Sequence, residues 1–294
     1  MPTAIPLQRS VLRLTGEDRV EFLQGLTTND VALASPDRSI YSVFLTPQGK
    51  FLHDFLIVAA PDALLIDLDG DADLRADLLR RLKMYRLRSK VAIEDVSDQW
   101  AVVALIDDGA LDTVGLPAEA GATAEYEGGY ALADPRTPSL GARLMLPADT
   151  AQGVVDGLAV AAGNADTYDH LRLSLGVPDG PRDLEREKSN VLEATLDQLN
   201  GISWTKGCYM GQELTARVHY RGLLKKRLVP VELDGPTPIA GSDLTQNGRV
   251  VGGLRSTAGE IGLALLRLDA LKQPEPIVAG ATKVTPRQAV WERG

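Results

Sequence analysis

The sequence predicts an α+β protein that is followed by a small all-β module. Helix-like and strand-like segments alternate in the first part of the chain, whereas after Arg227 short strand-like segments are separated by glycine, proline and asparagine turns. At 294 residues the chain is long enough for two domains of ordinary size. We therefore predict an α+β region over residues 1–226, which could consist of two sub-domains, and a β module over residues 227–294.

In the α+β region, helices are predicted where apolar residues recur every three or four positions, and strands where short apolar runs end at turns. Predicted helices cover residues 17–30, 71–88, 149–162 and 166–175, and predicted strands cover residues 41–45, 51–58, 63–68 and 100–106. Pro47 and Gly49 indicate a turn between the first two strands. Residues 107–138 are expected to be loop with short strands, and residues 176–188 a polar loop of a length that is often functional.

Strand candidates of the β module cover residues 228–233, 249–254, 261–266 and 282–285. Short strands at this spacing are typical of a small sandwich or barrel. The only cysteine of the chain lies near the join between the two regions. Because clefts between domains are common ligand sites, the join is a candidate functional site.

Charge and composition exclude several classes of protein. The formal net charge of -9 argues against a protein that mainly grips phosphate backbones, so no direct nucleic-acid partner is expected. No apolar run approaches the ~18 residues that would span a bilayer, and residues 1–10 lack a cationic leader before an apolar core. We expect no membrane partner. A single cysteine fits a reducing compartment, which predicts a cytoplasmic location.

Cys208 is the first candidate for a reactive group. Lys206 lies two positions before it, and a positive charge near a thiol favours the thiolate, which attacks electrophiles and binds metals. Gly207 and Gly211 would let the backbone bend and a ligand approach. A lone cysteine is also often a small buried hydrophobe, and this alternative stays open.

The metal-binding residues are few. The three histidines are His53, His170 and His219, and no CxxC, HxxxH or HExxH spacing is present, so we expect no stable metal site. An iron–sulfur cluster usually has four protein ligands, mostly thiolates. Any cluster held by this chain would need further ligands from a partner, a second copy or a small molecule.

A basic stretch follows the cysteine segment. It contains Arg217, Arg221, Lys225, Lys226 and Arg227, with no acidic residue among them. The stretch could be a solvated strand edge, where lysine prevents unwanted pairing, or a surface that receives an anionic ligand.

Four segments together resemble the YgfZ-type folate-binding proteins, which are relatives of the glycine-cleavage T-protein, an aminomethyltransferase. They are FLQGLTTND at residues 22–30, QGKFLHD at residues 48–54, LRL at residues 171–173 with Glu193, and KGCYMGQE at residues 206–213. The resemblance implies a T-protein-like folate-binding domain of ferredoxin-like halves, followed by a β-barrel. It implies tetrahydrofolate bound in a central hole, and a role in the assembly or repair of iron–sulfur clusters in a subset of enzymes, including radical enzymes that modify tRNA.

The resemblance also assigns roles to residues. Glu193 matches the glutamate that pairs with the pterin ring, a charge-assisted contact, although it could also be an acid at a helix N-terminus. Cys208 matches the defining thiol of the branch, and Lys206 the lysine that accompanies it. The remaining motif residues are expected to shape or order the loop, and they are Gly207, Tyr209, Gly211, Gln212 and Glu213.

The sequence departs from the transferases at residues 53 and 54. Aminomethyltransferases carry two adjacent aspartates there, whereas this chain has His53 and Asp54. Asp54 remains a candidate folate-binding residue, and His53 could be a strand residue without chemistry. Cellular folates carry polyglutamate tails, so Arg221, Lys225 or Lys226 is expected to contact such a tail.

The resulting hypothesis is a tetrahydrofolate-binding accessory protein whose single activated thiolate serves iron–sulfur clients or assembly proteins. Cys208 would ligate iron transiently or form a mixed disulfide with an oxidised client. One alternative is a folate-dependent aminomethyltransferase or demethylating one-carbon enzyme that uses Asp54 or His53 and Glu193. Another is a folate-binding regulator without chemistry of its own.

Overall fold

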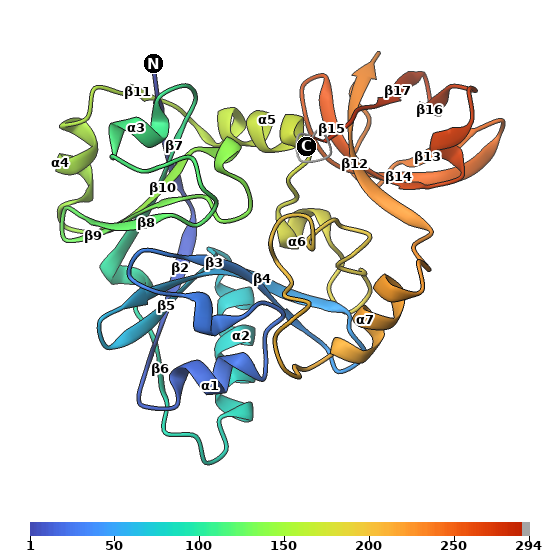
Figure 1. Ribbon diagram of the computed structural model, residues 1–294. Coiled ribbons are helices and arrows are strands. Elements are labelled where there is room, and N and C mark those ends of the chain that lie inside the picture. Colours follow the sequence, from blue (N-terminus) through green and yellow to red (C-terminus); the bar gives the residue numbers. More distant parts are fainter. Residues whose placement is uncertain (290–294) are drawn as a thin grey trace.

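A five-stranded antiparallel sheet forms the lower part of the molecule in the view of Figure 1. The computed structural model describes residues 1–289. The strand order of this sheet is β3-β4-β5-β2-β6, with bounds Ile40–Leu45, Phe51–Ala60, Ala63–Asp69, Arg9–Thr15 and Ala92–Asp95. Helices α1 (Arg19–Gln24) and α2 (Ala72–Tyr85) pack on it, and Leu78 and Leu82 of α2 share its apolar core. The Asp71 carboxylate caps α2 by accepting from the backbone N–H groups of residues 73 and 74.

A second sheet has six strands in the order β11-β1-β7-β10-β9-β8. Their bounds are Ala161–Ala162, Thr3–Leu7, Trp100–Ile106, Ala142–Pro147, Gly129–Ala133 and Thr123–Tyr126. Only β1 and β11 pair in parallel among these described strands. Helices α3 (Ala110–Thr113) and α4 (Ala151–Asp156) belong to this part of the chain. Because β1 and β2 are separated by Gln8 alone, the chain passes directly from one sheet to the other.

The C-terminal part is a closed six-stranded barrel in the order β12-β15-β14-β13-β16-β17. Its strands are Lys226–Asp234, Ile261–Arg267, Arg249–Ala258, Asp243–Gln246, Ile277–Ala279 and Thr282–Pro286. Short 3-10 helices complete the chain at Val31–Leu33, Ser97–Gln99, Pro138–Leu140 and Ala270–Lys272. Closure removes the unpaired edges that short strands would otherwise expose.

Helix α5 (Ala165–Leu175) joins the second sheet to the barrel (Figure 1). It ends at Gly176, whose left-handed φ of 76° lets its N–H return to the last turn. Leu173 of α5 packs with Leu228 and Leu263 of the barrel. Helix α6 (Gly180–Asp183) follows, and an irregular segment then leads along the first sheet to α7 (Gln212–Tyr220).

Several predicted boundaries need correction. The helix predicted at residues 17–30 covers only Arg19–Gln24, because the chain turns at Gly25 and residues 27 and 28 pack inward. The helix predicted at 149–162 ends at Asp156 and is followed by β11, and Thr150 makes no capping side-chain bond. The predicted polar loop 176–188 contains α6.

Other predictions of secondary structure are confirmed. The strands expected at residues 41–45, 51–58, 63–68 and 100–106 are present with small differences at their ends, as are the helices at 71–88 and 166–175 and all four barrel strands. Seven strands were not predicted, namely β1, β2, β6, β10, β11, β13 and β16. Across residues 1–289, every helix is too short or too polar to cross a lipid bilayer.

Candidate functional site

Cys208 is exposed on a loop, as is Gly207 before it, whereas Lys206 and Tyr209 on either side of this pair are buried. Lys206 anchors this loop, because its Nζ donates to the backbone carbonyls of Gln24 at 2.8 Å, Thr27 at 2.7 Å and Asn29 at 2.6 Å. These carbonyls belong to the turn that follows α1. The ammonium therefore ties the cysteine loop to a segment about 180 positions earlier in the chain.

The structure corrects the role expected for Lys206. Burial lowers the pKa of its ammonium to about 8, an effect that the Asp30 carboxylate opposes. An ammonium has three hydrogens, and those of Lys206 all go to carbonyls, so none is left for the Cys208 thiol. Lys206 holds the loop in place and does not hydrogen-bond the sulfur.

Backbone hydrogen bonds complete this anchor. The N–H of Met210 donates to Gly25 O at 3.1 Å, and the N–H of Ser203 donates to Thr28 O at 3.0 Å. The Thr28 hydroxyl donates to Gly201 O at 2.5 Å. The two motifs that stand out in the sequence, at residues 22–30 and 206–213, are thus one structural unit that presents the thiol.

Only one of the two motif glycines is required by the backbone. Gly211 has a φ of 83°, and a Cβ there would lie 2.6 Å from Thr46 O. Gly49 lies against it, since a Cβ on Gly49 would lie 2.9 Å from Gly211 O. Gly207 has open space around it and an ordinary φ. The expected shaping role therefore falls to Gly211.

The remaining motif residues have distinct environments. Tyr209 is buried with its ring 5.3 Å from Lys206 Nζ, and burial raises its pKa to about 12. Its hydroxyl has no partner in the described part of the chain. Gln212 and Glu213 begin α7, where the Glu213 carboxylate lies in the first turn and suits the helix dipole.

In the described part of the chain, Cys208 does not belong to a cluster of metal-binding side chains. Within residues 1–289, no three histidine, cysteine, aspartate or glutamate residues come together as a metal site. His219 is instead stacked on Trp204, with ring centroids 3.9 Å apart. One chain thus offers one exposed sulfur ligand.

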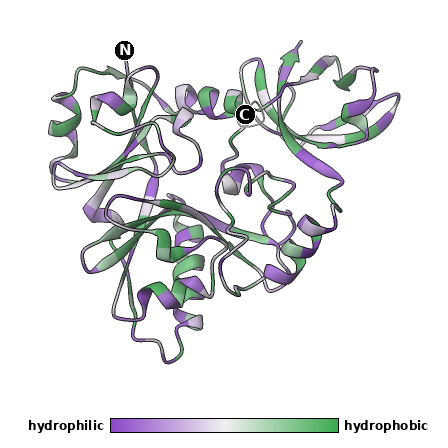
Figure 2. Cartoon of the chain, in the orientation of Figure 1, coloured by the Kyte–Doolittle hydropathy of each residue, from purple (hydrophilic) through white to green (hydrophobic). Residues whose placement is uncertain are grey.

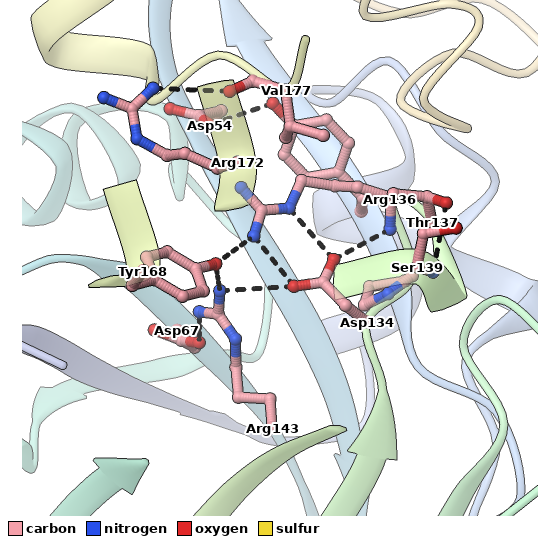
Figure 3. Close-up of polar contacts among 12 residues, drawn as sticks. Asp54, Asp67, Asp134, Arg136, Thr137, Ser139, Arg143, Tyr168, Arg172 and Val177 are labelled. Carbon is pink, nitrogen blue, oxygen red and sulfur yellow. Dashed lines mark hydrogen bonds and ion pairs between the residues drawn. The ribbon is translucent and has the colours of Figure 1, made fainter. Parts of the chain in front are cut away.

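A second polar region lies between the two sheets (Figure 3). Asp67 on β5 accepts from Arg9 and from Arg143 on β10, each at 2.6 Å. Asp134 accepts from Arg136 at 2.9 and 2.8 Å, and Arg136 also donates to the Tyr168 hydroxyl at 2.9 Å. These buried ion pairs join the sheets to each other and to α5.

Opposite charges control the ionisation in this region. Burial alone would raise the pKa of the Asp134 carboxyl, but the guanidinium groups of Arg136 and Arg143 outweigh burial and lower it to about 2. Asp67 follows the same pattern, with its pKa lowered by Arg9 and Arg143 against the effect of burial. Both aspartates therefore carry full negative charge at neutral pH.

This polar region borders a cavity of about 500 Å³. The arginines that line it are Arg9, Arg136, Arg143, Arg172 and Arg182. Two of their buried donors, Nε of Arg143 and Nη2 of Arg172, have no hydrogen-bond partner among the described residues. Buried donors without partners are costly.

The predicted folate residues are dispersed. Glu193 does not line this cavity but lies in a narrow crevice against Leu228 and Leu265 of the barrel. Burial raises its pKa, while Lys226 and Lys50 act in the opposite direction. The Glu193 carboxylate, which the sequence predicts to bind the pterin ring, is therefore separate from the arginine-lined cavity.

Asp54 lies behind α6 and is covered by Gly180, where a Cβ would come within 1.8 Å of Asp54 Oδ1. It accepts from the Tyr41 hydroxyl at 2.9 Å. Burial raises the pKa of Asp54 to about 6, and the nearby Asp179 carboxylate acts in the same direction. Asp54 is not among the residues that line the cavity.

His53, Arg221 and Lys225 also lie apart from the cavity. The buried His53 Nε2 is 2.9 Å from Asp77 Oδ2 on α2. Arg221 ends α7, and Lys225 precedes β12. The structure thus brings the cysteine motif together with the segment at residues 22–30, but it does not gather the predicted folate residues around one ligand site.

Sequence reasoning missed the inter-sheet residues. Asp67 and Arg143 each occupy an otherwise apolar strand, and both are buried. A charged residue inside an apolar strand is rarely buried without a partner. This pattern could have identified Asp67 and Arg143 as members of buried ion pairs, although it does not reveal which residues pair with each other.

Comparisons with known proteins agree with this architecture. A family model described as the GCVT N-terminal domain matches residues 9–110, and one described as the CAF17 C-terminal beta-barrel domain matches residues 225–293. The crystal structure of glycine cleavage system aminomethyltransferase T from Bartonella henselae has a TM-score of 0.79 at 17% identity, covering 98% of this chain and 85% of that chain. The chain therefore has the aminomethyltransferase-like fold with a C-terminal β-barrel, as predicted.

Sequence relatives point to one group of proteins. The mitochondrial iron–sulfur cluster assembly factor IBA57 of Mus musculus is 34% identical over 302 residues, which span 96% of this chain and 82% of the relative. The Homo sapiens protein of the same name is 37% identical over 284 residues, which span 90% of this chain and 77% of the relative. These relatives bear the name IBA57 where the sequence motif suggested the YgfZ branch. Their mitochondrial names contradict the cytoplasmic location expected from the sequence.

Proposed function

Because the chain belongs to the family of the iron–sulfur cluster assembly factors IBA57, we propose that it serves iron–sulfur cluster assembly or repair through the thiol of Cys208. The observation that carries this proposal is an exposed sulfur on a loop that Lys206 fixes to the body of the protein. A positioned thiol can meet a partner without first ordering its own loop.

The chemistry follows from the number of ligands. A cluster is cargo here, and Cys208 would bind one iron as thiolate while a partner supplies the other ligands. A single protein ligand suits transfer, because the cargo must also be released. The same thiolate could instead attack a disulfide of an oxidised client, which forms a mixed disulfide and releases the client's other sulfur as thiolate.

A rescue experiment tests the role of the thiol. A strain that lacks the protein receives wild type, Cys208→Ala or the control Gly207→Ala, and the readout is the activity of a cluster-dependent radical enzyme that modifies tRNA. Gly207 is exposed, with open space where a Cβ would lie, so its variant should behave as wild type. We expect Cys208→Ala to fold normally and to fail in rescue. Full rescue by Cys208→Ala would refute the thiol mechanism.

Tetrahydrofolate is the second component of the proposal. The arginine-lined cavity suits the carboxylates of a folate. Arg182, whose side chain lines the cavity and is 47% exposed, would hold such an anionic group. Bound folate would supply reducing or one-carbon chemistry, whereas the side chains of this chain bind and orient it.

Calorimetry with tetrahydrofolate separates the cavity from the Glu193 crevice. If the cavity holds the ligand, Arg182→Ala weakens binding and Glu193→Gln does not, because Arg182 lines the cavity and Glu193 does not. The reverse result would place the pterin ring at Glu193. Absence of binding to wild type would remove folate from the proposal and leave the role of Cys208 untouched.

A further inference from the structure

Helix α7 and the segment that follows it form an exposed surface beside the cysteine loop. Trp204, four positions before Cys208, stacks on His219 of α7, and Tyr220 lies edge-on to both rings. Tyr220 is 70% exposed and Leu223 is 51% exposed. Large apolar side chains at such exposure, next to a functional loop, are typical of an interaction site.

The surface also carries positive charge. Between Glu213 and Glu232 the sequence holds five lysine and arginine residues and no acid, in a chain of net charge -9. Two of the cations have acidic neighbours, since Lys226 acts on Glu193 and Arg227 acts on Asp197. The other three, Arg217, Arg221 and Lys225, are exposed and make no ion pair within residues 1–289. Figure 2 shows hydrophilic colouring along the start of β12.

We propose that this surface, defined by Trp204, His219, Tyr220, Leu223, Arg217, Arg221 and Lys225, docks the protein that shares an iron–sulfur cluster with Cys208. The inference rests on the proposed function. A cluster bound by thiolates carries net negative charge, and a protein that presents one offers an anionic face. Cationic side chains around a tyrosine and a leucine complement such a face and leave the exposed sulfur next to it.

The surface does not belong to the folate cavity. None of its residues lines that cavity, and α7 lies on the outer side of the molecule in Figure 1. The polyglutamate tail of a folate and an anionic membrane are two other anionic partners for this surface. Each of them predicts a different experimental outcome.

The test compares two triple variants in the rescue assay. Arg217→Glu/Arg221→Glu/Lys225→Glu reverses the docking surface, and Arg249→Glu/Lys272→Glu/Lys283→Glu reverses three exposed cations of the barrel as a matched control. Because opposed charges slow association strongly, we expect the first variant to lose rescue by about ten-fold or more, while the control retains it. Equal rescue by both variants would overturn the docking proposal.

Cys208→Ala, measured in parallel, separates the two claims. If Cys208→Ala fails and the docking-surface variant rescues, the docking surface is wrong and the thiol mechanism stands. If Cys208→Ala rescues, the proposed function fails, and the docking proposal fails with it.

Three further measurements identify the occupant. A photoreactive phenylalanine at position 220 should crosslink to a protein that carries a cysteine-ligated cluster, and the product should disappear in the docking-surface variant. Loss of affinity for tetrahydrofolate pentaglutamate in that variant would assign the surface to the folate tail instead. Binding of wild type, but not of the variant, to phosphatidylserine vesicles would assign it to a membrane. Either of the last two results would overturn the proposal.

Discussion

At the scale of single residues, Lys206 is the side chain on which the cysteine loop depends. Lys206→Met would leave three carbonyls of the turn after α1 without their donor, at a cost of about 3 kcal/mol in the free energy of unfolding. Urea unfolding measures this, and Lys225→Met, at an exposed lysine, serves as control. Equal stability of the two variants would contradict the anchoring role.

His53 gives a pH dependence. Burial lowers its pKa to about 4 from the usual 6.5, although the Asp77 carboxylate opposes this. Between these values the unfolded chain binds a proton that the folded chain does not, so stability falls as the pH drops from 6.5 towards 4. Urea unfolding across this range should show a smaller fall for His53→Gln, whereas His170→Gln, at an exposed histidine, should match wild type. If the stability of His53→Gln fell with pH as steeply as that of wild type, the lowered pKa of His53 would be refuted.

The residue scale also shows what the sequence could predict. Cys208 stands out in the sequence as the single cysteine within a glycine-containing polar segment, and the structure places it on the surface. The inward direction of the Lys206 side chain was not predictable, because its three acceptors belong to a turn far away in the sequence. Proximity to a thiol along the chain suggested activation, whereas tertiary structure gives the lysine another set of partners.

At the scale of elements, a buried ion pair joins α5 and α6 to the barrel. Arg172 Nη1 donates to Asp183 Oδ2 at 2.7 Å, and Asp183 Oδ1 accepts from the N–H of Ser256 on β14 at 3.0 Å. Asp183→Ala removes both contacts and should cost about 3 kcal/mol, because Arg172 is left with Asp169 as its only carboxylate partner among the described residues.

Hydrogen exchange measures the local effect of this change. Amides of β14 should exchange faster in Asp183→Ala than in wild type. Asp269→Ala removes a surface pair with Arg267 and should leave exchange in β14 unchanged. Unchanged protection of β14 in Asp183→Ala would show that the ion pair does not fasten the barrel.

Predictability differs between elements for physical reasons. Strands β4 and β5 were predicted because most of their residues are apolar and Pro61 and Asp62 mark the turn between them. Strands β1 and β2 were missed because Pro6, Gln8 and the two arginines within β2, Arg9 and Arg13, interrupt the apolar pattern. Arg9 is nonetheless accommodated, because Asp67 on the neighbouring strand accepts from it.

At the scale of the whole molecule, the barrel and the α+β region should unfold together. The apolar contact of Leu173 with the barrel and the Arg172–Asp183 pair couple them. In a Trp291→Phe variant, the fluorescence of the remaining Trp100 and Trp204 reports on the α+β region, and it should give the same urea midpoint as far-UV circular dichroism, which reports on all parts. Two separate midpoints in this variant would contradict the coupling.

The α+β class and the C-terminal β module follow from the sequence pattern, and the resemblance implies that the module is a barrel, but the arginine-lined cavity follows from neither. Its arginines come from β2, β10, α5 and α6 and from the segment after β9, and none of them stands out in the sequence when considered alone. Only the packing of the two sheets against α5 makes these charges neighbours. For the same reason the placement of Glu193 against the barrel, away from the cavity, was not foreseeable.

The most direct test of the central claim uses purified components. An apo iron–sulfur enzyme is incubated with a cluster-loaded carrier protein and either wild type or Cys208→Ala, and the rate at which enzyme activity appears is measured under anaerobic conditions. The account predicts that wild type accelerates activation and that Cys208→Ala, folded and equally stable, does not. Equal activation with the two proteins would contradict the claim that the thiol of Cys208 is the working group.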